Sequence, residues 1–209
     1  MKITPSGNST SIATLSACIK VPSYGISNIS RPGDIKVSPS GISNISRPGD
    51  IKVIGIDPGV TATGFAIIQG QKGVCTGTIR PKKADSYHKL EEICAALEQV
   101  MREHRPDLAA LEKAFYHKNV ASLVRISELR GAIIHTLIQT GTEIVEYMPT
   151  HIKLTATGNG RASKLQVRYF VEQLFRTGHN RISHHAIDAL AIAYTASRRA
   201  RPRIDRADD

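Results

Sequence analysis

The chain has 209 residues, 41% of them apolar and 22% charged, so it is long enough to bury one sizeable core and has the composition of an ordinary globular protein. No apolar run approaches the roughly 20 residues of a membrane-spanning helix, which excludes a transmembrane protein. Lys and Arg number 28 against 18 Asp and Glu, and this formal charge of +10 indicates a polyanionic partner.

The three cysteines are Cys18, Cys75 and Cys94. Because they are odd in number and far apart, they fit neither a disulfide framework nor a zinc cluster. We therefore expect a reducing compartment, with the bacterial cytoplasm as the default.

The first fifty residues are rich in Ser, Gly and Pro, and the segment GISNISRPGDIKV at 25–37 returns at 41–53. Two copies are too few for a repeat fold, which needs about three. We expect residues 1–50 to form a disordered extension, although an organelle transit peptide remains the alternative because the segment is Ser-rich and poor in acids. The Arg-rich tail at 198–209 is also expected to be disordered.

The segment 51–197 has the pattern of a packed α/β domain. Three short β-branched runs separated by Gly-containing turns predict an antiparallel meander, and helical and strand patterns then alternate. The expected strands are 51–57, 65–69, 73–80, 108–111 and 143–147. The expected helices are 85–103, one helix or two in series over 120–137, a helix capped by Ser163, and 183–197. This order predicts a mixed five-stranded sheet with helices on both faces.

Acidic residues follow two of the expected strands. Asp57 and Glu112 each come directly after an aliphatic run, where a charge is costly without a partner. His185 and Asp188 are three residues apart on the last helix and therefore share a face. If these four side chains converge, they could hold divalent cations such as Mg²⁺, and a pair of ions would suit phosphoryl transfer.

Each of these residues also has a purely structural explanation. Asp57 before Pro-Gly could be no more than a turn residue, and Glu112 could pair with Lys113 or with a neighbouring helix. His185 could be an ordinary helix residue, and its neighbour His184 leaves the choice of ligand open. The combination of the four carries the hypothesis.

Basic and aromatic residues near these acids could bind a nucleic acid. Lys118, Lys153, Arg161 and Lys164 fall in segments expected to be turns or helix starts, where they could contact phosphates or simply be solvated. Phe115 follows Glu112 by three residues and could stack on bases or lie in the core.

Several motifs in order resemble the RuvC family of Holliday junction resolvases over about residues 51–197. They are IGIDPG at 54–59 with TGF at 63–65, LEKAF at 111–115 with Lys118 and Asn119, ELRG at 128–131, EYMPT at 146–150 with Lys153, TGNGRASK at 157–164, and HHAIDALA at 184–191. The resemblance implies a ribonuclease H-like fold, a homodimer and Mg²⁺-dependent paired nicks in a four-way DNA junction during recombination and repair. A branch-migration helicase is a further partner that the resemblance suggests.

The resemblance also implies roles for single residues. Asp57, Glu112, His185 and Asp188 match the family's four metal-binding positions, the third of which is Asp in many members and His in others. Because imidazole is neutral and a softer donor, we expect His185 to favour Mn²⁺ over Mg²⁺ relative to an all-carboxylate site.

The residues that would act on the junction match the family as well. Lys153 and Lys164 match basic positions important to cleavage, and the counterpart of Phe115 stacks on or wedges apart bases.

Three other readings remain open at this point. One is a basic DNA-binding module without catalysis, and another is a YqgF-type nuclease acting on RNA. The third is an actin-like ATPase, because Asp57, Gly59 and Gly64 are close to the nucleotide loop of that class. The four candidate metal ligands disfavour the non-catalytic module. The turn at 157–164 disfavours the YqgF-type nuclease, and the shortness of the chain disfavours the actin-like ATPase.

Overall fold

The computed structural model describes residues 14–15, 51–70, 72–83, 85–113, 120–177 and 182–199. Phe115, Lys118, most of the expected N-terminal extension and nearly all of the C-terminal tail lie outside these ranges. Among the residues described, no helix has the length and apolarity needed to cross a membrane.

A mixed sheet forms the centre of the molecule. Strands β2 (Lys52–Asp57), β3 (Thr63–Gln69) and β4 (Lys72–Arg80) form the expected antiparallel meander. Strands β5 (Leu108–Glu112) and β6 (Glu143–Tyr147) continue the sheet in parallel from β2. These five strands confirm the predicted sheet.

The sheet has one further strand from the N-terminal segment. Strand β1 (Thr14–Leu15) pairs antiparallel with the edge of β4, which gives the order β1-β4-β3-β2-β5-β6. The exposed backbone groups of an edge strand favour such an addition, which residue patterning did not reveal. Cys75 on β4 is disulfide-bonded, which the spacing of the cysteines did not predict, whereas Cys94 is free.

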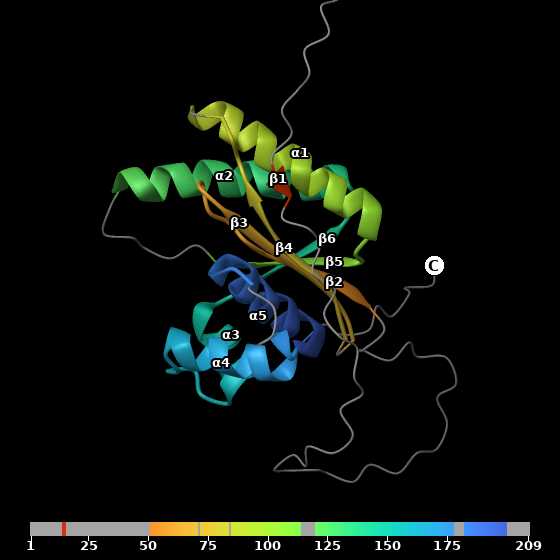
Figure 1. Ribbon diagram of the computed structural model, residues 1–209, viewed down its shortest axis with the longest axis vertical. Helices are drawn as coiled ribbons and strands as arrows, with labels where there is room; N and C mark the ends of the chain where they lie inside the picture. The colour runs from red at the N-terminus through yellow and green to blue at the C-terminus, as the bar shows by residue number, and fades with distance from the viewer. Residues whose placement is uncertain are drawn as a thin grey trace, which may run out of the picture.

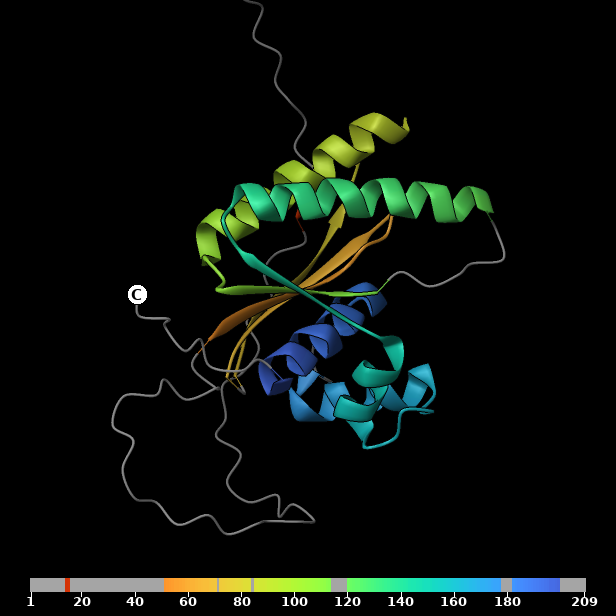
Figure 2. The same ribbon diagram turned by 180° about the vertical axis from the view of Figure 1, so that it is seen from behind.

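Helices cover both faces of the sheet, as predicted (Figures 1 and 2). Helices α1 (Ser86–His104) and α2 (Val120–Gln139) lie on one face, and α3 (Pro149–Thr157), α4 (Lys164–Leu174) and α5 (His184–Arg199) lie on the other. Alternate residues of β2 divide between the two cores, with Ile54 and Ile56 packed in the cluster that includes α1 and α2 and Val53 in the cluster that includes α5.

Helix α5 lies directly on β2 and β3 because glycines face it. A Cβ atom on Gly55 would lie 2.2 Å from the Ala189 carbonyl oxygen, and one on Gly64 would lie 2.0 Å from the carbonyl oxygen of His185. Small residues on both sides therefore bring the start of α5 against the end of β2.

Helix α3 was not predicted. Pro149 occupies its first turn and Gly158 ends it in the left-handed region, with φ of 74°. Lys153, expected on a turn or at a helix start, is thus within α3. The predicted cap of α4 is confirmed, because Ser163 and Gln166 form a reciprocal capping box.

Candidate active site

Three carboxylates from separate elements meet at one edge of the sheet. Parallel strands β2 and β5 end at Asp57 and Glu112, and α5 crosses this edge with Asp188 in its second turn. Asp57, Glu112 and Asp188 line a single cavity of about 250 Å³, together with Lys153 and Lys164. The expected convergence of the two strand ends and the last helix is therefore present.

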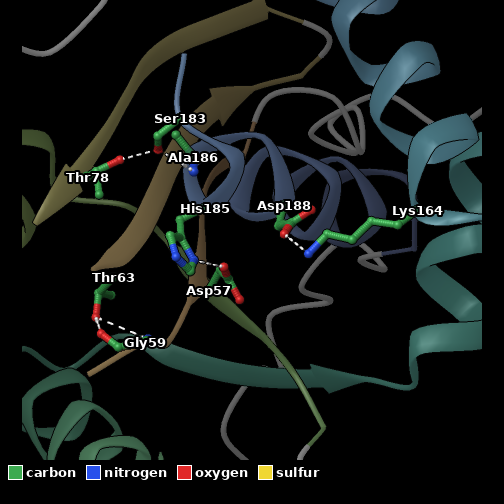
Figure 3. Close-up of polar contacts among 9 residues, drawn as sticks. All are labelled: Asp57, Gly59, Thr63, Thr78, Lys164, Ser183, His185, Ala186 and Asp188. Atoms are coloured by element: carbon green, nitrogen blue, oxygen red, sulfur yellow. Dashed lines mark hydrogen bonds and ion pairs between the residues drawn. The ribbon is translucent and has the colours of Figure 1, made fainter. Parts of the chain in front are cut away.

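Each of two carboxylates contacts one nitrogen (Figure 3). His185 Nδ1 lies 2.7 Å from Asp57 Oδ2, and Lys164 Nζ lies 2.6 Å from Asp188 Oδ2. A carboxylate accepts hydrogen bonds, so an ionised Asp57 would take this one from Nδ1–H of His185.

The two adjacent histidines point to different partners. His184 Nδ1 lies 2.5 Å from Arg168 Nη1 on α4, whereas His185 contacts Asp57. Of the two candidates that the sequence left open, His185 is thus the one placed beside the carboxylates.

The carboxylates are partly desolvated and repel one another. Burial raises the pKa of Asp57 above its ordinary value, the hydrogen bond from His185 opposes this, and the charge of Asp188 adds to it. Burial also raises the pKa of Glu112, followed by repulsion from Asp57 and Asp188. The hydrogen bond to Asp188 raises the pKa of Lys164, so the ammonium remains charged. The cavity therefore solvates the ionised forms of Asp57 and Glu112 poorly.

Polar contacts fix the segments that carry the site (Figure 3). The hydroxyl of Ser183 accepts from the Ala186 backbone N–H at 3.2 Å, which caps α5, and it also hydrogen-bonds Thr78 on β4. After β2, the hydroxyl of Thr63 donates to the Gly59 carbonyl at 3.0 Å. Neither Thr78 nor Thr63 carried a signal that would have identified this role from the sequence.

The donor set suits a hard divalent cation, although the side chains as placed do not form a coordination sphere. Within the described part of the chain, no three His, Cys, Asp or Glu side chains form a group that could hold an ion as they stand. Lys164 and His185 occupy one oxygen each of Asp188 and Asp57. Three carboxylates sharing one cavity nevertheless offer the oxygen ligands that Mg²⁺ and Mn²⁺ accept. The raised pKa values of Asp57 and Glu112 indicate that their ionised forms are destabilised there, and a bound cation would stabilise them.

The predicted DNA-binding residues fall in three places. Lys153 and Lys164 line the carboxylate cavity. Arg161 is exposed on the turn between α3 and α4 and is not among the cavity-lining residues. Phe115 and Lys118 lie outside the described residues, so their roles stay predictions.

A mixed sheet of this order, covered on both faces and carrying carboxylates at the ends of its central strands, has the arrangement expected of a ribonuclease H-like nuclease. The family model described as crossover junction endodeoxyribonuclease RuvC matches residues 53–196. The chain belongs to this family, which confirms the expected family, fold and enzyme class.

Relatives and solved structures agree with this assignment. The RuvC proteins of Halorhodospira halophila and Chlorobaculum parvum are 37% and 36% identical, each over 68% of this chain and over 86% and 79% of their own lengths. The structure titled T. thermophilus RuvC in complex with Holliday junction substrate has a TM-score of 0.64 at 24% identity, covering 70% of this chain and 93% of that one. That likeness shows the shared fold.

Proposed function

We propose that this protein resolves Holliday junctions, in DNA recombination and repair, by hydrolysing phosphodiesters at the cavity between β2, β5 and α5. The observation that carries this proposal is the convergence of Asp57, Glu112 and Asp188 in one cavity, in a chain of the crossover junction endodeoxyribonuclease family. The formal charge of +10 supports a nucleic-acid substrate.

The residues that would hold metal are Asp57, Glu112, His185 and Asp188. Two Mg²⁺ or Mn²⁺ ions held there would supply Lewis-acid chemistry, polarising the scissile phosphate and activating water. Asp57, at the end of the central strand β2, would be the central ligand of the set. We infer a preference for Mn²⁺ because His185 replaces an oxygen donor by nitrogen.

His185 has a single nitrogen available for chemistry. Its Nδ1 contacts Asp57, so with a proton on Nδ1 the neutral ring would have Nε2 either to bind a cation or to take a proton from water, and one role excludes the other. Lys153 and Lys164 lower the negative potential of the cavity and thereby reduce repulsion of an approaching phosphate.

Arg161 on the neighbouring turn, with Lys118 and Phe115, would contact DNA beyond the cavity.

A two-fold symmetric junction that is nicked in two strands calls for two active sites, and we infer a homodimer. Helix α2 buries Leu129, Ile133 and Leu137, whereas Val120, Val124 and Ile138 elsewhere on it are 66%, 51% and 59% exposed. On the helical repeat of 3.6 residues these three apolar residues fall opposite the buried side and share a face with Gly131.

Gly131 makes this face suitable for a second helix. A Cβ atom at Gly131 would meet nothing within 4 Å, so the packing of this chain does not demand glycine there. A bare backbone amid an exposed apolar stripe allows close approach of a second copy of α2. Sedimentation of Val124→Glu tests this, with a monomer expected and an unchanged dimer refuting it.

Cleavage assays with Asp57→Asn test the catalytic site. The variant should lose cleavage of a synthetic four-way junction with Mg²⁺ or Mn²⁺ while binding the junction with wild-type affinity. Glu143→Gln at the start of β6 is exposed and removes one acid elsewhere, so it should cleave normally. Cleavage by Asp57→Asn near the wild-type rate would remove Asp57 from the mechanism.

Parallel reactions with linear duplex, structured RNA and ATP separate the alternatives. Preferential cutting of RNA would favour the YqgF-type reading, ATP hydrolysis the actin-like one, and binding without cleavage the non-catalytic one. Nicks at symmetric positions in opposite strands of the junction support the resolvase.

The wider setting of the protein remains a prediction. We propose that the protein works with a branch-migration helicase and is located in the bacterial cytoplasm. We also propose that the nuclease domain is bounded at residues 50 and 197. Co-purification, fluorescence of a tagged full chain, and limited proteolysis test them in turn.

A further inference from the structure

Arg130 on α2 connects two strands at the edge that carries the site. Its Nη1 donates to the backbone carbonyl of Glu112 at 2.6 Å, and its Nη2 forms an ion pair with Glu146 on β6. The Arg130 side chain is only 13% exposed, and that of Glu146 is 36% exposed. A largely buried cation therefore spans from a helix on one face of the sheet to the ends of β5 and β6.

The bonded carbonyl belongs to the candidate metal ligand itself. Glu112 is the last residue of β5, and the next backbone N–H, that of Lys113, donates to the Tyr147 carbonyl at 2.8 Å. The Glu112 carbonyl is held by Arg130 from the α2 side while its carboxylate lines the cavity. The direction of the carboxylate thus depends on a backbone that Arg130 fixes.

An arginine is suited to this place in a way that lysine is not. The planar guanidinium presents donors in a rigid fork, so one side chain bonds a carbonyl and a carboxylate on neighbouring strands at once. A lysine ammonium keeps the charge but lacks this fixed fork. Arg130 belongs to the ELRG segment at 128–131, to which no role in the site has yet been given.

We propose that Arg130 is a positioning residue for Glu112, which holds the end of β5 against β6 so that the Glu112 carboxylate faces the other ligands. The proposal rests on the proposed function, because it assigns Glu112 a cation to bind. It differs from a phosphate-contact role, since the guanidinium is turned into the protein and is engaged by two acceptors.

The test measures Mn²⁺ binding by electron paramagnetic resonance alongside junction affinity and cleavage. Outer-shell partners of metal ligands typically contribute about 10–100-fold in metal affinity or activity. Arg130→Ala should weaken Mn²⁺ binding and lower the cleavage rate at saturating junction within that range, with junction affinity measured without metal unchanged within about twofold. Arg130→Lys should remain defective in Mn²⁺ binding.

Two further variants control the result. Arg125→Ala removes an exposed cation from the same helix and should leave Mn²⁺ binding unchanged. Glu146→Gln keeps the side-chain size and weakens only one arm of the bridge, so it should reproduce a smaller loss in a protein that folds normally. This second variant decides the matter if Arg130→Ala does not fold.

Three results would overturn the proposal. A loss of junction affinity with a shallower salt dependence and unchanged Mn²⁺ binding would make Arg130 a phosphate contact. Lower thermal stability with wild-type Mn²⁺ affinity and cleavage rate would make its role purely structural. Wild-type Mn²⁺ binding and cleavage by Arg130→Lys would show that only the positive charge at this position matters. A wild-type protein that neither binds Mn²⁺ nor cuts junctions would refute the proposed function as well, whereas active wild type beside unaffected variants refutes this inference alone.

Discussion

Gly64→Ala tests how closely stability and chemistry depend on the contact between β3 and α5. A Cβ atom at Gly64 would lie 2.0 Å from the carbonyl oxygen and 2.2 Å from the carbonyl carbon of His185. Real Cβ atoms essentially never approach below 3.0 Å, so the backbone of α5 must retreat by about 1 Å at the residue whose ring contacts Asp57. The obstacle is backbone, which cannot rotate away as a flexible side chain does.

The expected cost has two parts. Overpacking of this kind lowers the free energy of unfolding by about 1–3 kcal/mol, which for a domain of this size corresponds to a Tm lower by roughly 2–12 °C. A displacement of about 1 Å at a catalytic group can reduce the rate by about 100-fold. Cleavage should therefore fall far more than the folded fraction when both are measured well below the Tm.

Calorimetry and single-turnover cleavage of a four-way junction measure the two parts. Gly160→Ala is the matched control for stability, because the nearest atom to its Cβ, the Thr150 carbonyl oxygen, is at 3.4 Å, an ordinary contact. A Gly64→Ala protein with wild-type Tm and wild-type cleavage would refute the reasoning, since α5 would then not be fixed where the structure has it.

The other predictions concern charge and metal at the same edge. Because its pKa is raised, folded Glu112 keeps a proton to higher pH than the ordinary 4.5, so the free energy of unfolding falls as pH rises from that value through the raised pKa. Glu112→Gln should therefore raise the Tm of the metal-free protein at pH 7, and calorimetry should show that this difference vanishes near pH 4. The same variant should lose the stabilisation that Mn²⁺ gives the wild type. His185→Asp should lower the Mg²⁺ concentration for half-maximal cleavage relative to that of Mn²⁺, and wild type that already uses limiting Mg²⁺ as well as Mn²⁺ would contradict this. Phe115→Ala should impair cleavage more than salt-dependent affinity, and an equal loss of both would exclude a wedge.

The sequence supports the sheet and the positions of the acids well, for identifiable reasons. Aliphatic runs that end in Asp57 and Glu112 locate the strand ends, and the parallel neighbours β2 and β5 bring those ends to one edge. The three-residue spacing of His185 and Asp188 places them on one face of α5. These are local patterns with a single geometric consequence each.

Helix α3 was missed although its signals are present. Pro149 in the first turn and Gly158 at the end mark a helix, and Ile152 and Ala156 are its buried residues four positions apart. The segment is short, with nine residues, and its apolar residues are few, so its helical periodicity is weak. Its consequence is local: Lys153 is held on a helix facing the cavity.

The sequence did not predict which polar side chains of the site contact one another directly. The contact of Asp57 with His185 joins residues 128 positions apart, and that of Lys164 with Asp188 depends on how α4 is placed beside α5. The pairing of β1 with β4 likewise depends on which edge of the sheet remains open. Periodicity identifies faces and ends but does not say which of them meet.

The two faces of the sheet control different ligands of one site. On the α5 side, Gly55 and Gly64 let the helix lie on β2 and β3, and this close approach brings Asp188 to the cavity and His185 into contact with Asp57. On the α2 side, Arg130 holds the backbone of Glu112. Asp57 lies on the strand β2 between these two helical layers. A change in the α5 layer would move His185 and Asp188 relative to Asp57, and a change in the α2 layer would move Glu112, although neither change alters Asp57 itself.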